Sequence, residues 1–133
     1  MKKHLLFLLA LIPFLMGCKA IRLTMNDSGK TINVADGAKF KVELVSNRST
    51  GNNWTNLSYD KEIIKLTDEP VYQQNKSGLT GAPGTVTYTF KALKPGNTDL
   101  KMEYVPIGNP HKVPLKTFSV SVVVKEHNQF YFW

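Results

Sequence analysis

The chain has 133 residues with a formal net charge of +7; 42% of the residues are hydrophobic, 11% are aromatic and one is a cysteine. This length predicts a single domain, since domains commonly hold about 100–200 residues, and the apolar content excludes a wholly disordered chain. A single cysteine excludes an internal disulfide, and no set of cysteines and histidines has the spacing of a zinc site.

The amino-terminal segment is predicted to be a targeting signal. Two lysines precede an apolar run over residues 5–16, which is shorter than the about 20 residues that span a membrane and fits a signal peptide. The run ends in Leu-Met-Gly-Cys at residues 15–18, which resembles the lipobox of bacterial lipoproteins. The resemblance implies removal of residues 1–17 and lipidation of Cys18. The expected location is then the bacterial cell envelope, anchored by lipid in the outer membrane or at the cell surface or periplasm; the alternative is an ordinary signal peptide with a chance cysteine.

Three further segments follow from the distribution of polar and apolar residues. Residues 18–30 are polar and show no periodicity, which predicts a tether between the lipid and the domain. Residues 31–126 are expected to form the domain. Residues 127–133 form a tail that ends in four aromatic residues, and we expect this tail to fold back onto the sheet, because an exposed aromatic patch favours association.

The domain shows the alternation of apolar and polar residues that is typical of half-buried strands. The segments with this pattern or with a short apolar run are 31–34, 40–44, 63–66, 85–93, 100–104 and 118–124. Turn sequences separate them, among them Asp36-Gly37 and the Lys-Pro-Gly-Asn of residues 94–97. No stretch has the pattern of an amphipathic helix. The sequence therefore predicts an all-β fold, an immunoglobulin-like antiparallel β-sandwich of about seven strands.

Three connections are longer than a sandwich requires, and exposed loops of this kind commonly carry function. They are residues 47–54, 76–84 and 104–114, and they are rich in Gly, Asn, Ser and Pro. These residue types favour turns, positive φ angles and exposed backbone amides.

The order and spacing of residues in these connections resemble the chagasin family of cysteine peptidase inhibitors. Asn47, Thr50, Gly51 and Trp54 stand at the spacing of that family's Asn-Pro-Thr-Thr-Gly-aromatic-x-Trp motif. Residues 81–84, Gly-Ala-Pro-Gly, fall where its glycine-rich second motif belongs, just before a strand. The resemblance covers the chain from about residue 31 to residue 125.

The chain departs from the family pattern in all three motifs. Arg48 replaces a proline, Asn52 replaces an aromatic residue, and Pro83 replaces a glycine. The third motif, Arg-Pro-Trp, is absent, and Tyr104 to Ile107 occupy its region.

The resemblance implies a reversible inhibitor of papain-like cysteine peptidases; streptopain-like peptidases are a further candidate target. Three loops would enter the active-site cleft, with Thr50 nearest the catalytic Cys and His and with Asn47 and Gly51 shaping the first loop. Trp54 would either pack in the core, which we favour, or contact the enzyme, and Tyr104 and Ile107 are the candidates for a contact with the cleft wall. The residues expected to bind the peptidase are Asn47, Arg48, Ser49, Thr50, Gly51, Asn52, Gly81, Ala82, Pro83, Gly84, Tyr104, Pro106 and Ile107.

Other functions fit the sequence less well. The two histidines beyond the signal segment, His111 and His127, lie in no nucleophile or metal pattern, so neither catalysis nor a cofactor or metal is expected. Scattered basic residues do not form the footprint of a nucleic-acid-binding protein. We expect a monomer. The alternative function is a lipid-anchored immunoglobulin-like adhesion or assembly module of the bacterial envelope that uses the same three loops.

Overall fold

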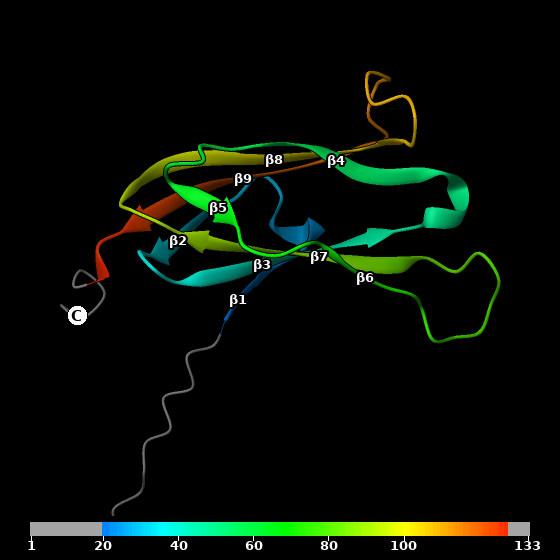
Figure 1. Ribbon diagram of the computed structural model, residues 1–133, viewed down its shortest axis with the longest axis horizontal. Helices are drawn as coiled ribbons and strands as arrows, with labels where there is room; N and C mark the ends of the chain where they lie inside the picture. Colours follow the sequence, from blue (N-terminus) through cyan, green and yellow to red (C-terminus); the bar gives the residue numbers. More distant parts are fainter. Residues whose placement is uncertain (1–19, 128–133) are drawn as a thin grey trace, which may run out of the picture.

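The computed structural model describes residues 20–127, which form two β-sheets packed face to face (Figure 1). One sheet has the order β1 (Ile21–Leu23), β3 (Lys39–Ser46), β7 (Gly84–Ala92) and β5 (Ile64–Leu66), and β6 (Val71–Gln73) pairs with β7 on the same side as β5. The other has the order β2 (Thr31–Ala35), β9 (Lys116–Lys125), β8 (Gly96–Pro106) and β4 (Asn52–Ser58). The all-β sandwich prediction is thus confirmed.

Two pairings depart from the predicted antiparallel plan. β1 runs parallel to β3, and β2 runs parallel to β9, while the other pairings are antiparallel. Alternation of apolar and polar residues determines which side chains face the core, but it carries no information about the direction of the neighbouring strand.

The core lies between the two sheets and is built from the alternating positions. Phe40, Val42 and Leu44 of β3 are 0–1% exposed, and Phe118 of β9 is fully buried opposite them. The rings of Phe40 and Phe90 stack at a centroid distance of 5.4 Å. Every core residue of the described chain lies between Leu23 and Val124.

The predicted tether is wrong for most of its length. Residues 21–23 form β1, and Leu23 is 3% exposed within the core. Thr24 then caps a short 3-10 helix, η1 (Met25–Asp27), and the Asp27 carboxylate accepts a hydrogen bond from the Thr24 backbone amide at 2.8 Å. Three residues are too few to show a strand period, so only the pairing with β3 reveals this strand.

Two other strands were not predicted, and some predictions fall outside the described chain. β6 was absent from the prediction, and the first residues of β4 were assigned to the loop 47–54. The predicted signal peptide, Cys18 and nearly all of the aromatic tail lie outside residues 20–127. Within this range no helix is long and apolar enough to cross a membrane.

Candidate functional site

The three long connections meet at one end of the sandwich (Figure 1, right). In the structure they comprise residues 47–51 (first loop), 74–83 (second loop) and 107–115 (third loop). Ser46 pairs with Gly84, and Asn52 pairs with Pro106, so residues that flank the three loops are neighbours in the two sheets. The sequence prediction that these loops form one surface therefore agrees with the fold.

Asn47 determines the shape of the first loop. It is the N-cap of the 3-10 turn η2 (Arg48–Thr50), and its Oδ1 accepts hydrogen bonds from the Ser49 amide at 3.2 Å and the Ser49 hydroxyl at 2.5 Å. The Thr50 hydroxyl donates to the Asn47 carbonyl at 2.7 Å. Gly51 ends the turn at φ 73°, a left-handed conformation that residues with a Cβ resist.

The first loop is braced against both neighbouring loops. Asn47 Nδ2 donates to the Gly81 carbonyl of the second loop at 3.0 Å. The Tyr104 hydroxyl accepts a hydrogen bond from the Asn47 amide at 3.0 Å. The Ile107 amide, where the third loop begins, donates to the Gly51 carbonyl at 2.7 Å. These three bonds join the first loop to the second loop, to the third loop and to Tyr104 of β8.

The tip of the first loop carries exposed polar groups. Ser49 and Thr50 are exposed, and Asn52 donates from Nδ2 to the Thr50 hydroxyl oxygen at 3.0 Å. Asn52 thus forms a contact inside the loop. The turn presents a hydroxyl-rich edge to a partner.

The Arg48 side chain contacts β6. Its guanidinium carbon lies 4.0 Å from the centroid of the Tyr72 ring in β6, a cation–π contact of about 0.5–1 kcal/mol at an exposed site. Burial raises the pKa of the nearby Tyr88 hydroxyl, and the positive charge of Arg48 opposes this effect without cancelling it.

Trp54 belongs to the core, as the favoured interpretation predicted. It is 2% exposed, its Nε1 donates to the Val45 carbonyl at 2.9 Å, and its ring lies 5.2 Å from that of Tyr104. The Tyr88 hydroxyl donates to the Trp54 carbonyl at 3.2 Å. This cluster forms the base on which the first loop rests.

Two residues that were predicted to contact the peptidase are buried within the domain. Tyr104 is 6% exposed, because its ring packs on Trp54 and its hydroxyl supports the first loop from below. Gly84 is buried, and a Cβ built on it would lie 2.4 Å from the Gln73 carbonyl oxygen and 2.5 Å from the Tyr72 hydroxyl. The structure therefore assigns Tyr104 and Gly84 to positioning the loops, while Ile107 remains 67% exposed.

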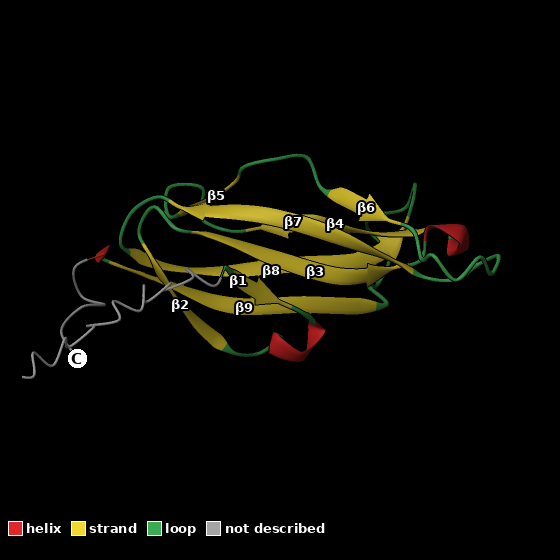
Figure 2. Ribbon diagram, turned by 90° about the horizontal axis from the view of Figure 1, so that it is seen from below, coloured by secondary structure: helices red, strands yellow, loops and turns green. Residues whose placement is uncertain are grey.

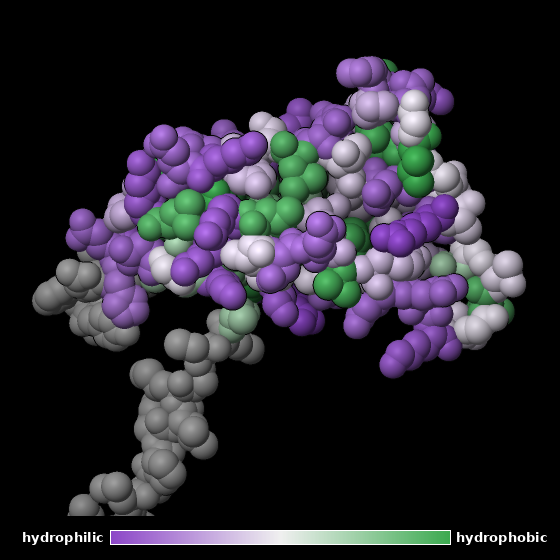
Figure 3. Space-filling model, in the orientation of Figure 1, coloured by the Kyte–Doolittle hydropathy of each residue, from purple (hydrophilic) through white to green (hydrophobic). Residues whose placement is uncertain are grey.

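The third loop presents apolar side chains that sequence reasoning did not single out. Val113 and Leu115 are 82% and 62% exposed, and Figure 3 shows apolar surface below the tip of this loop. Asn56 holds the loop by donating from Nδ2 to the Pro110 carbonyl at 3.0 Å and to the Glu103 carboxylate at 2.8 Å. The hydrogen bond from Asn56 lowers the pKa of Glu103. Pro106, at the base of the loop, is half-buried.

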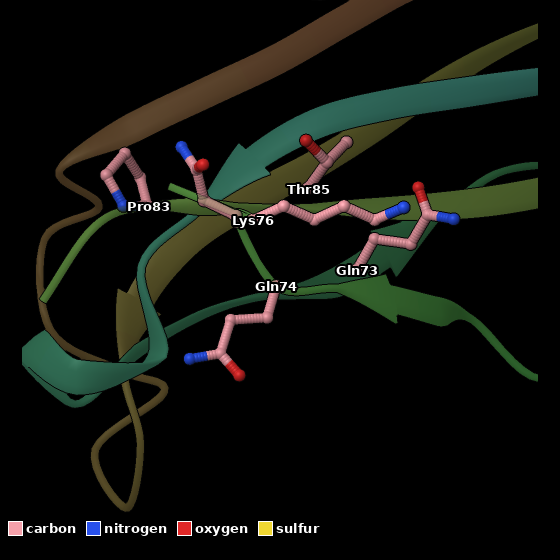
Figure 4. Close-up of a pocket in the computed structure, with 7 residues that line it drawn as sticks. Gln73, Gln74, Lys76, Pro83 and Thr85 are labelled. Carbon is pink, nitrogen blue, oxygen red and sulfur yellow. The ribbon is translucent and has the colours of Figure 1, made fainter. Parts of the chain in front are cut away.

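The second loop projects beyond the sheet and borders an open hollow of about 460 Å³, lined by residues 73–76 at the end of β6 and residues 83–85 at the start of β7 (Figure 4). The Lys76 side chain extends along this hollow beside Gln73 and Thr85 (Figure 4). At the tip, the Ala82 amide donates to the Leu79 carbonyl at 3.2 Å, and the Leu79 side chain is 73% exposed. Gly81, Ala82 and Pro83 follow this tip back toward the first loop.

The groups at this end are suited to binding rather than catalysis. They are hydroxyl groups and exposed apolar side chains, carried by loops that hydrogen bonds join to one another. No group of three or more His, Cys, Asp or Glu residues among residues 20–127 could hold a metal ion. A sandwich with three cross-braced loops at one end defines a protein-recognition module.

Comparison with known proteins identifies the kind of module. The model of the chagasin family of peptidase inhibitors, I42, matches residues 33–122. The chain belongs to this family and is a peptidase inhibitor, not an enzyme. Amoebiasin-2 of Entamoeba histolytica is 29% identical over 104 residues, which cover 77% of this chain and 84% of that protein.

Solved structures share the fold. The cysteine protease inhibitor EhICP2 from Entamoeba histolytica superposes with a TM-score of 0.69 at 29% identity, covering 80% of this chain and 96% of that one. The solution structure of Amebosin gives a TM-score of 0.64 at 23% identity, with coverage of 80% and 98%. PbICP-C, solved in complex with falcipain-2, gives a TM-score of 0.51 at 21% identity, with coverage of 80% and 91%; the last two likenesses concern the fold alone.

Proposed function

We propose that this chain is a reversible inhibitor of papain-like cysteine peptidases that inserts the first loop into the active-site cleft, with the second and third loops against the cleft walls. Membership of the family and the likeness to EhICP2, a cysteine protease inhibitor, support this proposal. Thr50 and Ser49 would approach the catalytic residues. The exposed side chains of Leu79, Ile107 and Val113 supply apolar contacts on either side.

The observation that carries the proposal is the bracing of the first loop. Asn47 bonds to Gly81 on one side, Gly51 bonds to Ile107 on the other, and Tyr104 supports the turn from below. A loop that is already ordered loses little conformational entropy on docking, so a small contact area gives tight binding.

The same turn explains how the loop would resist cleavage. Peptidases attack a carbonyl that an extended substrate presents to the nucleophile, whereas residues 48–50 form a 3-10 turn. The carbonyls of Asn47, Arg48 and Gly51 already accept hydrogen bonds from Thr50, Gly51 and Ile107. Peptide carbonyls held in this way are not free to rotate into an oxyanion hole.

The test is a titration of residues 19–133 against papain-like and streptopain-like peptidases. We expect stoichiometric, reversible inhibition, with the intact inhibitor recovered afterwards and identified by its mass. A folded sample that does not inhibit at micromolar excess would contradict the proposal, and the adhesion or assembly module would then lead.

We also propose that the protein is a monomer held in the bacterial cell envelope by lipid on Cys18. The Leu-Met-Gly-Cys sequence of residues 15–18 supports this anchor. So does the parallel pairing of Ile21 with Phe40, because β3 starts there and ends at the first loop. An anchor at Cys18 therefore leaves the loops at the far end. The mass of the mature amino-terminal peptide tests the lipid, and sedimentation of the unlipidated chain tests the monomer.

A further inference from the structure

A row of lysines crosses three neighbouring strands on the outer face of one sheet. The ladders place Lys39 of β3 beside Lys91 of β7, and Lys91 beside Lys65 of β5. Lys39 and Lys65 are exposed, and Lys91 is partly exposed. Lys41 follows on the same face of β3. We call these four residues the lysine row; Figure 2 looks onto the strands that carry it.

The lysine row has no ionic partner within the described chain. The ion pairs among residues 20–127 join Arg22 to Glu43, Lys30 to Asp27, Lys94 to Glu62, and Lys101 to Glu103. Neighbouring strands lie about 4.8 Å apart, and like charges directly opposite one another destabilise a sheet. Repulsion between these lysines therefore lowers the stability of the folded chain unless an anion binds there.

The row also lies where the chain enters the domain. Ile21 pairs with Phe40, which stands between Lys39 and Lys41. Cys18 precedes Ile21 by three residues, so it lies within about 11 Å of the start of β1 even when that segment is fully extended. A lipid on Cys18 would bring this edge of the sheet to the bilayer surface.

We infer that the lysine row binds the anionic phospholipid headgroups of the membrane that holds the Cys18 lipid, an inference that rests on the proposed anchor. A lysine close to an anionic membrane surface strengthens binding roughly fivefold, within a Debye length of about 8 Å. The row stands at the start of β3, where Lys39 and Lys41 lie eight and six residues before the first loop, so the loops remain about 20 Å away along the strand. The contact thus leaves the three loops outside the part of the surface that the headgroups would cover.

The test uses the mature chain, residues 18–133, with Cys18→Ser so that no lipid contributes. Sedimentation with phosphatidylcholine vesicles, with and without phosphatidylglycerol, measures binding at low salt. We expect binding only to vesicles that contain phosphatidylglycerol. Replacing three lysines, Lys39→Gln, Lys65→Gln and Lys91→Gln, should lower that binding about a hundredfold. The matched control removes three charges elsewhere, Lys76→Gln, Lys101→Gln and Lys112→Gln, and should change it by less than about fivefold.

Each other outcome overturns the inference. Equal losses in the two triple variants would show that net charge alone matters, and equal binding to both kinds of vesicle would show that the headgroup charge does not. Thermal unfolding controls for misfolding, because removing the row should leave the melting temperature unchanged or higher. Inhibition of papain by the row variant should equal that of the parent, so failure of the inhibitory function is recognised separately from failure of this contact.

Discussion

At the scale of single residues, Asn47 connects the largest number of elements in the site. Its Oδ1 accepts from Ser49, its Nδ2 donates to Gly81, its backbone amide donates to Tyr104, and its carbonyl accepts from Thr50. An aspartate would keep the first of these contacts and lose the donor for Gly81. Position 47 therefore needs a side chain that offers both a hydrogen-bond acceptor and a hydrogen-bond donor, as an amide does.

Thr50 is the residue whose replacement should separate binding from folding. The change Thr50→Arg places a long charged side chain on the exposed tip of η2. We expect the inhibition constant to rise at least thirtyfold, which corresponds to the about 2 kcal/mol of a binding hot spot. The free energy of unfolding should change by no more than about 1 kcal/mol, since the two hydrogen bonds that the Thr50 hydroxyl loses are both exposed to water. Titration and urea unfolding measure the two quantities.

The matched control for this change is Thr50→Ser, which keeps the hydroxyl that donates to the Asn47 carbonyl. It should inhibit within about threefold of the parent, because the deleted methyl group is small. Normal inhibition by Thr50→Arg would show that the first loop does not enter the cleft.

Tyr104 should affect inhibition by holding the first loop in position and not by contacting the peptidase. The change Tyr104→Phe keeps the ring on Trp54 and removes the hydroxyl that accepts from the Asn47 amide. We expect a loss of about 1 kcal/mol in unfolding free energy and an inhibition constant raised about fivefold. The control is Thr98→Val, which removes a hydroxyl that accepts from the Asp60 amide near the start of β8, away from the loops. An equal effect of both changes on inhibition would contradict the positioning role.

At the scale of elements, the β6–β7 pair holds the second loop in place. Gly84 faces Tyr72 and the Gln73 carbonyl with no room for a Cβ. The change Gly84→Ala should therefore push β6 away from β7, at a cost of about 1–3 kcal/mol in unfolding free energy. The Tyr72 ring also contacts the guanidinium of Arg48 in the first loop. Because a shift of β6 would disturb that contact, we expect weaker inhibition as well. Urea unfolding and peptidase titration test both effects.

The control for this change is Gly78→Ala in the second loop. Gly78 has φ 70° and no atom within 4 Å of the added Cβ, so only its conformation costs stability, by about 1 kcal/mol. If Gly84→Ala kept the parent's stability and lost inhibition, Gly84 would contact the peptidase directly, as the sequence predicted.

The length of each element explains what the sequence could predict. Strands β3, β7, β8 and β9 are long enough to show alternation, and the sequence predicted a strand within each of them from that pattern. β1 and β6 have three residues each, and only their neighbours on β3 and β7 make them strands. β4 begins with Asn52 and Asn53, which resemble loop residues.

The candidate site also contains some features that the sequence could predict and others that it could not. The motif of residues 47–54 predicted the turn at Asn47, the left-handed Gly51 and the buried Trp54. The roles of Tyr104 and Gly84 depend on the register between distant strands, which opposes Trp54 to Tyr104 and Ser46 to Gly84. No local pattern encodes that register.

At the scale of the whole molecule, the described chain enters the sandwich at one end, beside the start of β3, and presents the three loops at the other, where β3 ends (Figure 1). The strands between them form a rigid spacer, because one continuous core joins both sheets. Inhibition should therefore depend on which end is attached to a surface.

This dependence can be measured by attaching the chain to vesicles through a single thiol. The mature chain coupled through Cys18 to a maleimide lipid should inhibit papain within about threefold of the free chain, since the loops lie about 20 Å from the attachment end. The same chain with Cys18→Ser and Asn109→Cys is coupled through the exposed third loop instead. We expect it to lose inhibition at least tenfold on vesicles and to inhibit normally before coupling. Equal inhibition by the two coupled forms would mean that the peptidase does not approach the three-loop end.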